Sequence, residues 1–164
     1  FRAAMPSASL VCADVSQASL DISRASHGQD AQHVQIVDGH LPFPDHHFDA
    51  AFACCVFHHI PHSEHTAALR EIRRVTQPGG LLMVYEHNPM NPLTVRAVRT
   101  CPFDENAVLI KPSRLMQDGR RAGWSVWSRD YRVFFPALLA ALRPLEDRLR
   151  WLPLGAQYYV AFQA

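Results

Sequence analysis

The sequence of 164 residues is long enough for one domain with a sizeable core, and its apolar content of 48% is that of an ordinary globular protein. A formal net charge of +1 gives no reason to expect a nucleic acid or an anionic membrane as a partner, and no apolar run approaches the roughly 18 residues of a membrane span. The four cysteines lack the paired spacing of a metal or redox site, so we expect reduced thiols and a cytoplasmic protein.

The chain begins with a short apolar run and a helix. The run Ser9 to Asp14 ends in a carboxylate, and a helix over Gln17 to Ser26, capped by Ser16, is predicted to follow it. Three later runs are short, rich in β-branched or aromatic residues and bounded by turn formers, which favours buried strands. They read VQIV (34–37), FDAAFACCVF (48–57) and LLMVY (81–85).

A helix is predicted between the last two of these runs. Apolar residues recur at helical spacing over Ser63 to Gln77, and Pro78, Gly79 and Gly80 then end the pattern. A strand, a crossover helix and a second strand of this size imply parallel neighbours in one sheet.

The second half of the chain continues the alternation of helices and strands. A short helix is expected over Leu93 to Arg99, a helix capped by Ser113 over Arg114 to Ala122, and a strand over Trp124 to Phe134. The segment CPFDENAVLI (101–110) is interpreted as a lid over the crevice. Pro136 opens a helix whose leucines are expected to face inward, namely Leu138, Leu139, Leu142 and Leu145, and AQYYVAFQA (156–164) is a last strand.

Polar residues follow the ends of the predicted strands. Ligands of parallel sheets bind beyond the carboxyl ends of the strands. We therefore expect Asp38, the segment Ala53 to His59, and the segment Glu86 to Asn88 to line one crevice.

Several of these stretches together resemble the class I S-adenosylmethionine-dependent methyltransferases, particularly those that act on small molecules. The resemblance rests on VDGHLPFPDHHFD, VFHHI and LREIRRVTQPGGLLMVYEHN, and it extends over almost the whole chain. It implies an α/β fold, a doubly wound and mostly parallel Rossmann-like sheet with an antiparallel last strand, as a single methyltransferase domain over residues 1–164. It also implies S-adenosylmethionine as methyl donor and a small-molecule acceptor.

The family's first strand and its glycine-rich loop have no counterpart in the sequence. The first forty residues hold only Gly28 and Gly39, neither in that context. We therefore expect the first strand to be missing and the chain to be an N-terminally incomplete piece of a longer protein.

The resemblance assigns cofactor contacts to three strand ends. Asp14 would accept hydrogen bonds from the ribose diol, with Val15 against the adenine; alternatively, Asp14 starts a turn or caps the following helix. Asp38 would meet the adenine amino group beside Gly39, although the same Asp-Gly pair is equally typical of a turn. Backbone groups of Ala53 and Cys54 would hold the methionine part of the cofactor.

Five residues are candidates for substrate chemistry. They are His58, His59, Glu86, His87 and Asn88. A histidine, or Glu86, would take a proton from the acceptor, and Asn88 would orient a substrate oxygen. The alternatives are packing of the histidines in the helix-entry turn and loop capping before proline.

No metal is expected. His58, His59, His62 and His65 suggest zinc by their spacing, but Pro61 interrupts the segment and the methyltransferase resemblance requires no metal.

The predicted function is methyl transfer to an oxygen, nitrogen or carbon atom of a small molecule. Two alternatives from other classes stay open. One is a truncated pseudoenzyme or interaction subunit without catalysis, because the glycine loop is missing. The other is a dinucleotide-binding dehydrogenase, because an acid after the second strand also suits a dinucleotide ribose. The sequence indicates no oligomeric state.

Overall fold

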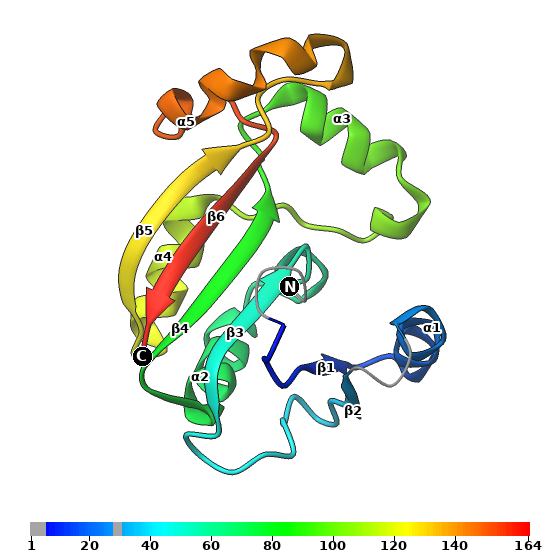
Figure 1. Ribbon diagram of the computed structural model, residues 1–164, viewed down its shortest axis with the longest axis vertical. Helices are drawn as coiled ribbons and strands as arrows, with labels where there is room; N and C mark the ends of the chain where they lie inside the picture. The colour runs from blue at the N-terminus through cyan, green and yellow to red at the C-terminus, as the bar shows by residue number, and fades with distance from the viewer. Residues whose placement is uncertain (1–5, 28–30) are drawn as a thin grey trace. The chain divides into compact units, whose positions relative to one another are not determined.

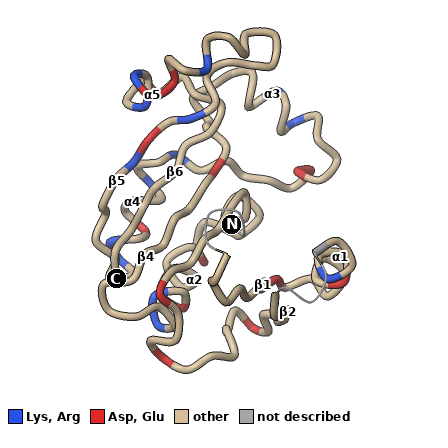
Figure 2. The backbone as a smooth tube through the Cα atoms, viewed as in Figure 1, with Lys and Arg blue, Asp and Glu red and all other residues tan. Residues whose placement is uncertain are grey.

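The computed structural model describes residues 6–27 and 31–164, and its contacts divide the chain into two compact units, residues 1–44 and 45–164 (Figure 1). The organisation as a single domain therefore stays a prediction, and each unit is described by itself. Acidic and basic residues are interspersed along both units over the described residues, in line with the nearly balanced charge (Figure 2).

The first unit holds a parallel pair of strands joined by a helix. β1 (Val11–Asp14) pairs with β2 (Gln32–Gln35), and α1 (Gln17–His27) lies between them in the chain. The predicted helix is confirmed, and so is its cap, because the Ser16 hydroxyl accepts a hydrogen bond from the Ser19 amide at 3.2 Å. The prediction that VQIV forms the strand up to Asp38 is wrong, because β2 ends at Gln35.

The second unit is built on a four-stranded mixed sheet. The strand order is β3 (Phe48–Cys54), β4 (Thr76–His87), β6 (Gln157–Gln163) and β5 (Ser125–Arg132). β3 and β4 are parallel, and β6 runs antiparallel to both of its neighbours. The parallel crossover pair and the antiparallel last strand are thus confirmed.

Helical segments connect these strands. Between β3 and β4 lie η1 (Phe57–His59) and α2 (His65–Val75), and after β4 come α3 (Pro92–Thr100), η2 (Pro102–Asp104) and α4 (Pro112–Arg121). After β5 follow η3 (Ala137–Leu145) and the single turn α5 (Glu146–Leu149).

The boundary between α2 and β4 differs from the prediction. The strand begins at Thr76, and the pairing of β4 with β3 shifts register between Phe48 and Ala50, where the Pro78–Gly80 segment loops out of the ladder. Gly79 has a φ of +80°, and a Cβ on Gly80 would lie 2.8 Å from the Asp49 carbonyl oxygen. The glycines therefore allow the Pro78–Gly80 segment to bulge out of β4 close to β3.

Two predictions on the later helices are wrong. α4 begins at Pro112 after Lys111, so Ser113 lies inside the helix and does not cap it. No residue of η3 is buried, and Leu138 is 93% exposed, so its leucines do not face inward. The non-helical backbone at Leu139 and the presence of Pro144 inside the segment prevent the regular turn that the leucine spacing requires.

The core lies on one face of the four-stranded sheet. Leu82 and Val84 of β4 are fully buried, whereas Leu81 and Met83, on the opposite face, are each 37% exposed. The core is completed by the helices α2 and α4 through Leu69, Leu115 and their neighbours. The sheet of this unit is therefore covered by helices on one side.

Helix α4 approaches β6 through a glycine. A Cβ on Gly119 would overlap the ring of Phe162, lying 2.8 Å from its Cζ, and Phe162 is fully buried. Because the ring is fully buried in the core, a shift that makes room for an added Cβ would disturb its other packing contacts and cost free energy.

Replacement of Gly119 by alanine should destabilise the protein. In an exposed helix this change adds about 1 kcal/mol of stability, but here the overlap with Phe162 should cost about 1–3 kcal/mol. Urea unfolding followed by circular dichroism measures the difference, with Gln117→Ala on the exposed side of α4 as control. A gain in stability for Gly119→Ala would show that α4 is not packed this closely.

Candidate active site at the carboxyl ends of β3 and β4

The candidate site lies where the parallel strands β3 and β4 end. Cys54 stands opposite Tyr85 in the ladder, so the next residues of each strand emerge at the same edge of the sheet. Of the three segments expected to line one crevice, 53–59 and 86–88 meet, because the Glu86 carboxylate contacts the turn after β3 directly. Asp38 belongs to the first unit, so its place in the crevice stays a prediction.

Glu86 holds that turn with both carboxylate oxygens. Its Oε1 accepts the backbone N–H groups of Val56 and Phe57, at 3.1 and 2.7 Å, and its Oε2 accepts Nδ1–H of His58 at 2.6 Å. Glu86 and His58 are both fully buried. A buried carboxylate with this set of donors is a structural anchor, and we refer to this arrangement as the Glu86 clamp.

His58 stands between two carboxylates. Its Nδ1 faces Glu86, and its Nε2 lies 3.4 Å from Asp104 Oδ1. Burial lowers the pKa of His58, but the hydrogen bond to Glu86 and the charges of Glu86 and Asp104 outweigh burial and raise it above its ordinary value.

Asp104 joins the site from the segment after α3. Its Oδ1 also lies 3.6 Å from His59 Nε2, and its backbone N–H donates to the Cys101 carbonyl. Although burial opposes the shift, a hydrogen bond from the Cys101 thiol and the charge of His58 lower the pKa of Asp104. Asp104 was not among the predicted site residues, although the 101–110 segment was predicted to cover the crevice as a lid.

His59 and His87 are the more accessible imidazoles of the site. The side chain of His59 is 44% exposed, and His87 is partly buried with its ring centroid 5.2 Å from that of His58. Burial, with the positive charge of His58, lowers the pKa of His87. At neutral pH His87 is therefore a neutral imidazole with a lone pair.

Asn88 is tied to another loop of the protein. Its amide nitrogen donates to the carbonyl oxygens of Pro153 and Gly155, at 3.1 and 2.7 Å, and its Oδ1 accepts the Met90 N–H. The side chain is fully buried. These bonds favour the loop-capping interpretation of Asn88.

Ala53 and Cys54 form the last two ladder positions of β3, which is an edge strand of its sheet. Cys55 follows with a φ of +55°, and its N–H donates to the Tyr85 carbonyl at 2.9 Å. Burial, with the charges of Cys54 and Glu86, raises the pKa of the Cys55 thiol to about 12.

The remaining cofactor candidates lie in the first unit. Asp14 Oδ1 accepts the Ser16 N–H at 2.8 Å, and Val15 is 67% exposed. Asp38 and Gly39, with φ of +51° and +72°, form a two-residue turn closed by the His40 N–H and the Val37 carbonyl. The structure therefore shows Asp14 and Asp38 in turns, as the alternative interpretation of each residue states. Their contacts with the nucleoside part of the cofactor stay predictions.

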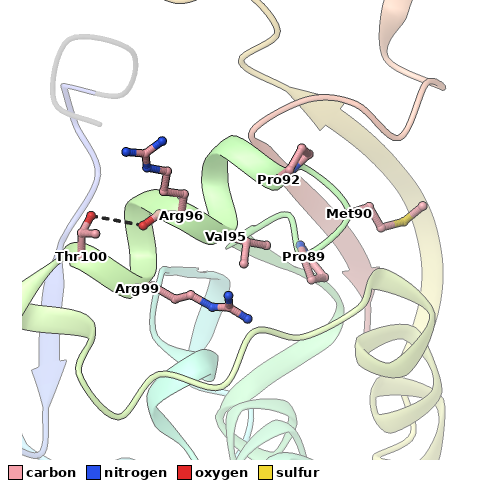
Figure 3. A pocket seen from close by; sticks show the side chains of 7 residues that line it. All are labelled: Pro89, Met90, Pro92, Val95, Arg96, Arg99 and Thr100. Carbon is pink, nitrogen blue, oxygen red and sulfur yellow. Dashed lines mark hydrogen bonds between the residues drawn. The ribbon is translucent and has the colours of Figure 1, made fainter.

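An open pocket of about 550 Å³ begins just after the Glu86–Asn88 segment. It is lined by Pro89, Met90, Pro92, Val95, Arg96, Arg99 and Thr100. Figure 3 shows Pro89, Val95 and Arg99 on the same side of α3. The lining combines apolar side chains with two guanidinium groups.

Residues 1–84 match the family model described as a methyltransferase domain. Two relatives carry the name ubiquinone/menaquinone biosynthesis C-methyltransferase UbiE. The protein from Ectopseudomonas mendocina is 35% identical over 104 residues, 60% of this chain and 40% of that protein. The one from Hahella chejuensis is 32% identical over 119 residues, 69% of this chain and 46% of that protein. The chain thus spans less than half of the length of either relative.

Solved structures confirm the fold. An S-adenosylmethionine-dependent methyltransferase from Mesorhizobium loti superposes with a TM-score of 0.67 at 15% identity, covering 95% of this chain and 80% of that one. A possible histamine N-methyltransferase from Thermotoga maritima gives 0.70 at 20% identity, covering 92% and 71%.

Removal of the Glu86 carboxylate should destabilise the second unit. Glu86→Ala leaves two amide N–H groups and His58 buried without their acceptor, which should cost about 3 kcal/mol. Glu86→Gln should cost less, because the amide oxygen still accepts from the turn. Chemical unfolding measures both, with the exposed Glu105→Ala expected to stay within about 0.5 kcal/mol of the parent. Equal stability of all three variants would contradict the clamp.

Cys55 should react slowly with iodoacetamide. Because the thiolate is the nucleophile, a thiol with a pKa of about 12 should be alkylated at least about tenfold more slowly than an ordinary one at mildly alkaline pH. Mass spectrometry of timed samples gives the rate for each thiol, and the exposed Cys54 is the internal comparison. Equal rates at Cys54 and Cys55 would show that Cys55 is not shielded.

Proposed function

Because this chain belongs to the class I S-adenosylmethionine-dependent methyltransferases, we propose that its protein transfers the sulfonium methyl group of S-adenosylmethionine to a small-molecule acceptor. The observation that carries the proposal is the Glu86 clamp. It fixes the turn after β3, where the methionine part of the cofactor is expected to bind against Ala53 and Cys54. A fixed turn presents its backbone groups without reorganisation when the cofactor binds.

The nucleoside part is assigned to the first unit. Asp14 is proposed to accept hydrogen bonds from the ribose hydroxyls, with Val15 against the adenine and the turn of Asp38 and Gly39 beside the amino group. The exposure of Val15 supports this assignment, and so does the open space beside Gly39, where an added Cβ would meet no described atom within 4 Å.

The proposed acceptor is an aromatic ring with an ionisable hydroxyl group, methylated at carbon. Two observations support this class. The relatives are named for C-methylation in quinone biosynthesis. The pocket beside α3 offers apolar side chains to a ring, and Arg96 and Arg99 to a negative oxygen.

The proposed reaction is an in-line displacement. The bond between sulfur and the methyl carbon breaks as a bond to the acceptor carbon forms, S-adenosylhomocysteine leaves, and the acceptor carbon loses its proton. His87 is proposed to take that proton, because His58 and Glu86 are buried against each other and His59 faces Asp104. Alignment of acceptor and donor would supply most of the acceleration.

Cofactor binding tests the first part of the proposal. S-adenosylhomocysteine is titrated calorimetrically into the parent protein and Asp14→Asn, which should bind about tenfold more weakly because a charge-assisted acceptor is lost. Asp21→Asn, an exposed carboxylate of the same unit that pairs with Arg24, should bind like the parent. Absence of binding both to the parent and to the same chain extended upstream through the glycine-rich loop would favour the non-catalytic alternative.

Methyl transfer from labelled S-adenosylmethionine to a panel of phenols tests the proton acceptor. His87→Asn should lower kcat at least about tenfold while the affinity for S-adenosylhomocysteine stays unchanged. His33→Asn, in the first unit, is the control. An unchanged kcat would remove His87 from the reaction, and loss of cofactor affinity would assign it a structural role.

A further inference from the structure

The geometry points to a binding site for a divalent transition-metal ion, with His58, His59 and Asp104 as its ligands. Each of the three side chains offers one ligand atom, a ring nitrogen or a carboxylate oxygen, and these atoms lie within 4.8 Å of one another. The site is distinct from the residues proposed to hold the cofactor, and it departs from the sequence-based expectation of no metal.

The spacing of the donor atoms suits a single ion. Zinc binds nitrogen and oxygen at about 2.0–2.2 Å, so two ligands of a tetrahedral ion lie about 3.3–3.6 Å apart. Asp104 Oδ1 lies 3.4 Å from His58 Nε2 and 3.6 Å from His59 Nε2. Both separations match this range, and the ligand nitrogens of the two histidines lie within 4.8 Å of each other.

The Glu86 clamp orients the buried ligand. Its carboxylate accepts Nδ1–H of His58 at 2.6 Å, which leaves the lone pair of the neutral imidazole on Nε2. A carboxylate behind a histidine is the usual outer-shell partner of a metal-bound imidazole, and it fixes the ring orientation.

The His58 Nε2 atom itself requires a positive partner. It is buried and makes no hydrogen bond to any described residue, although it points at the Asp104 carboxylate. A lone pair against a carboxylate is repulsive unless a cation lies between them. That cation is either a proton, which makes His58 an imidazolium, or a metal ion. Only a metal ion would also bind the ring nitrogen of His59, which lies 3.6 Å from the same carboxylate oxygen.

The backbone holds the two loops of the site together. The Val108 N–H donates to the His58 carbonyl at 2.8 Å, and η2 turns the chain so that Asp104 faces the histidines. Because His59 is 44% exposed, the remaining coordination positions are open to water or to an anionic ligand.

The second pair of neighbouring histidines, His62 and His65, fits a metal ion less well. His65 Nε2 lies 3.0 Å from the carbonyl oxygens of Phe57 and Ile60, so it is a hydrogen-bond donor there. The nearest carboxylate, Asp118, lies 3.8 Å from His65 Nδ1 and already accepts from Arg114 at 2.7 Å. This pair therefore provides a control site of similar composition.

Titration of Zn²⁺ alone into the 164-residue chain, at neutral pH and without chelators, tests the inference. We expect one tight site, and Asp104→Asn should weaken it at least about tenfold, the lower bound for loss of even an outer-shell partner. His59→Gln should have a similar effect. Asp104→Asn removes no histidine, so its effect cannot come from a general loss of imidazole.

The matched control is His62→Gln, which should bind Zn²⁺ within about twofold of the parent because it lies outside the ligand set. Thermal unfolding by circular dichroism checks that every variant is folded. Absence of zinc binding to the parent would identify the cation as a proton and overturn the inference, as would equal affinity in Asp104→Asn and the parent. None of these readouts depends on S-adenosylmethionine, so they are independent of the proposed methyl transfer.

Discussion

The second unit depends on one buried carboxylate. Glu86 is the penultimate residue of β4, and its two oxygens satisfy the backbone N–H groups of Val56 and Phe57 and the ring of His58. In a low-dielectric interior each of these donors would otherwise be costly. The turn after β3 therefore has one favourable conformation, and the position of His58 and His59 follows from it.

The polar residues of the site fall into two groups, those that anchor the backbone and those that are accessible to a substrate. Glu86 and Asn88 are fully buried and bonded within the protein, whereas His59 and His87 retain accessible ring surface. Asp104 connects the two groups, since it approaches both His58 and His59 from a separate loop. An anchored layer beneath an accessible layer is the arrangement expected of a preorganised site.

The sequence predicted the strands and helices where a single local pattern decides them. The parallel pair β3 and β4 and the helix α1 with its Ser16 cap are of this kind. The antiparallel direction of β6 was implied by the resemblance to the methyltransferases. Prediction from the sequence failed for η3, where Pro144 and the non-helical backbone at Leu139 interrupt leucines at helical spacing, and for the cap of α4, where Pro112 takes the first position.

The site was predictable in part for the same reason. Residues at the ends of adjacent parallel strands must meet, so the approach of Glu86 to the turn after β3 followed from order alone. Asp104 approaches His58 from the segment between α3 and α4. The sequence of that segment has no helical or strand periodicity from which its path could be predicted. The pairing of Asn88 with Pro153 and Gly155 likewise joins segments 65 and 67 residues apart.

The one-sided cover of the four-stranded sheet has a thermodynamic consequence. Leu82 and Val84 are buried by helices, while Leu81, Met83 and the 67% exposed Trp127 keep contact with water in the folded state. The heat capacity of unfolding scales with the apolar area that becomes hydrated only on unfolding. The exposed side chains of this face therefore add little to the heat capacity of unfolding and to its urea dependence.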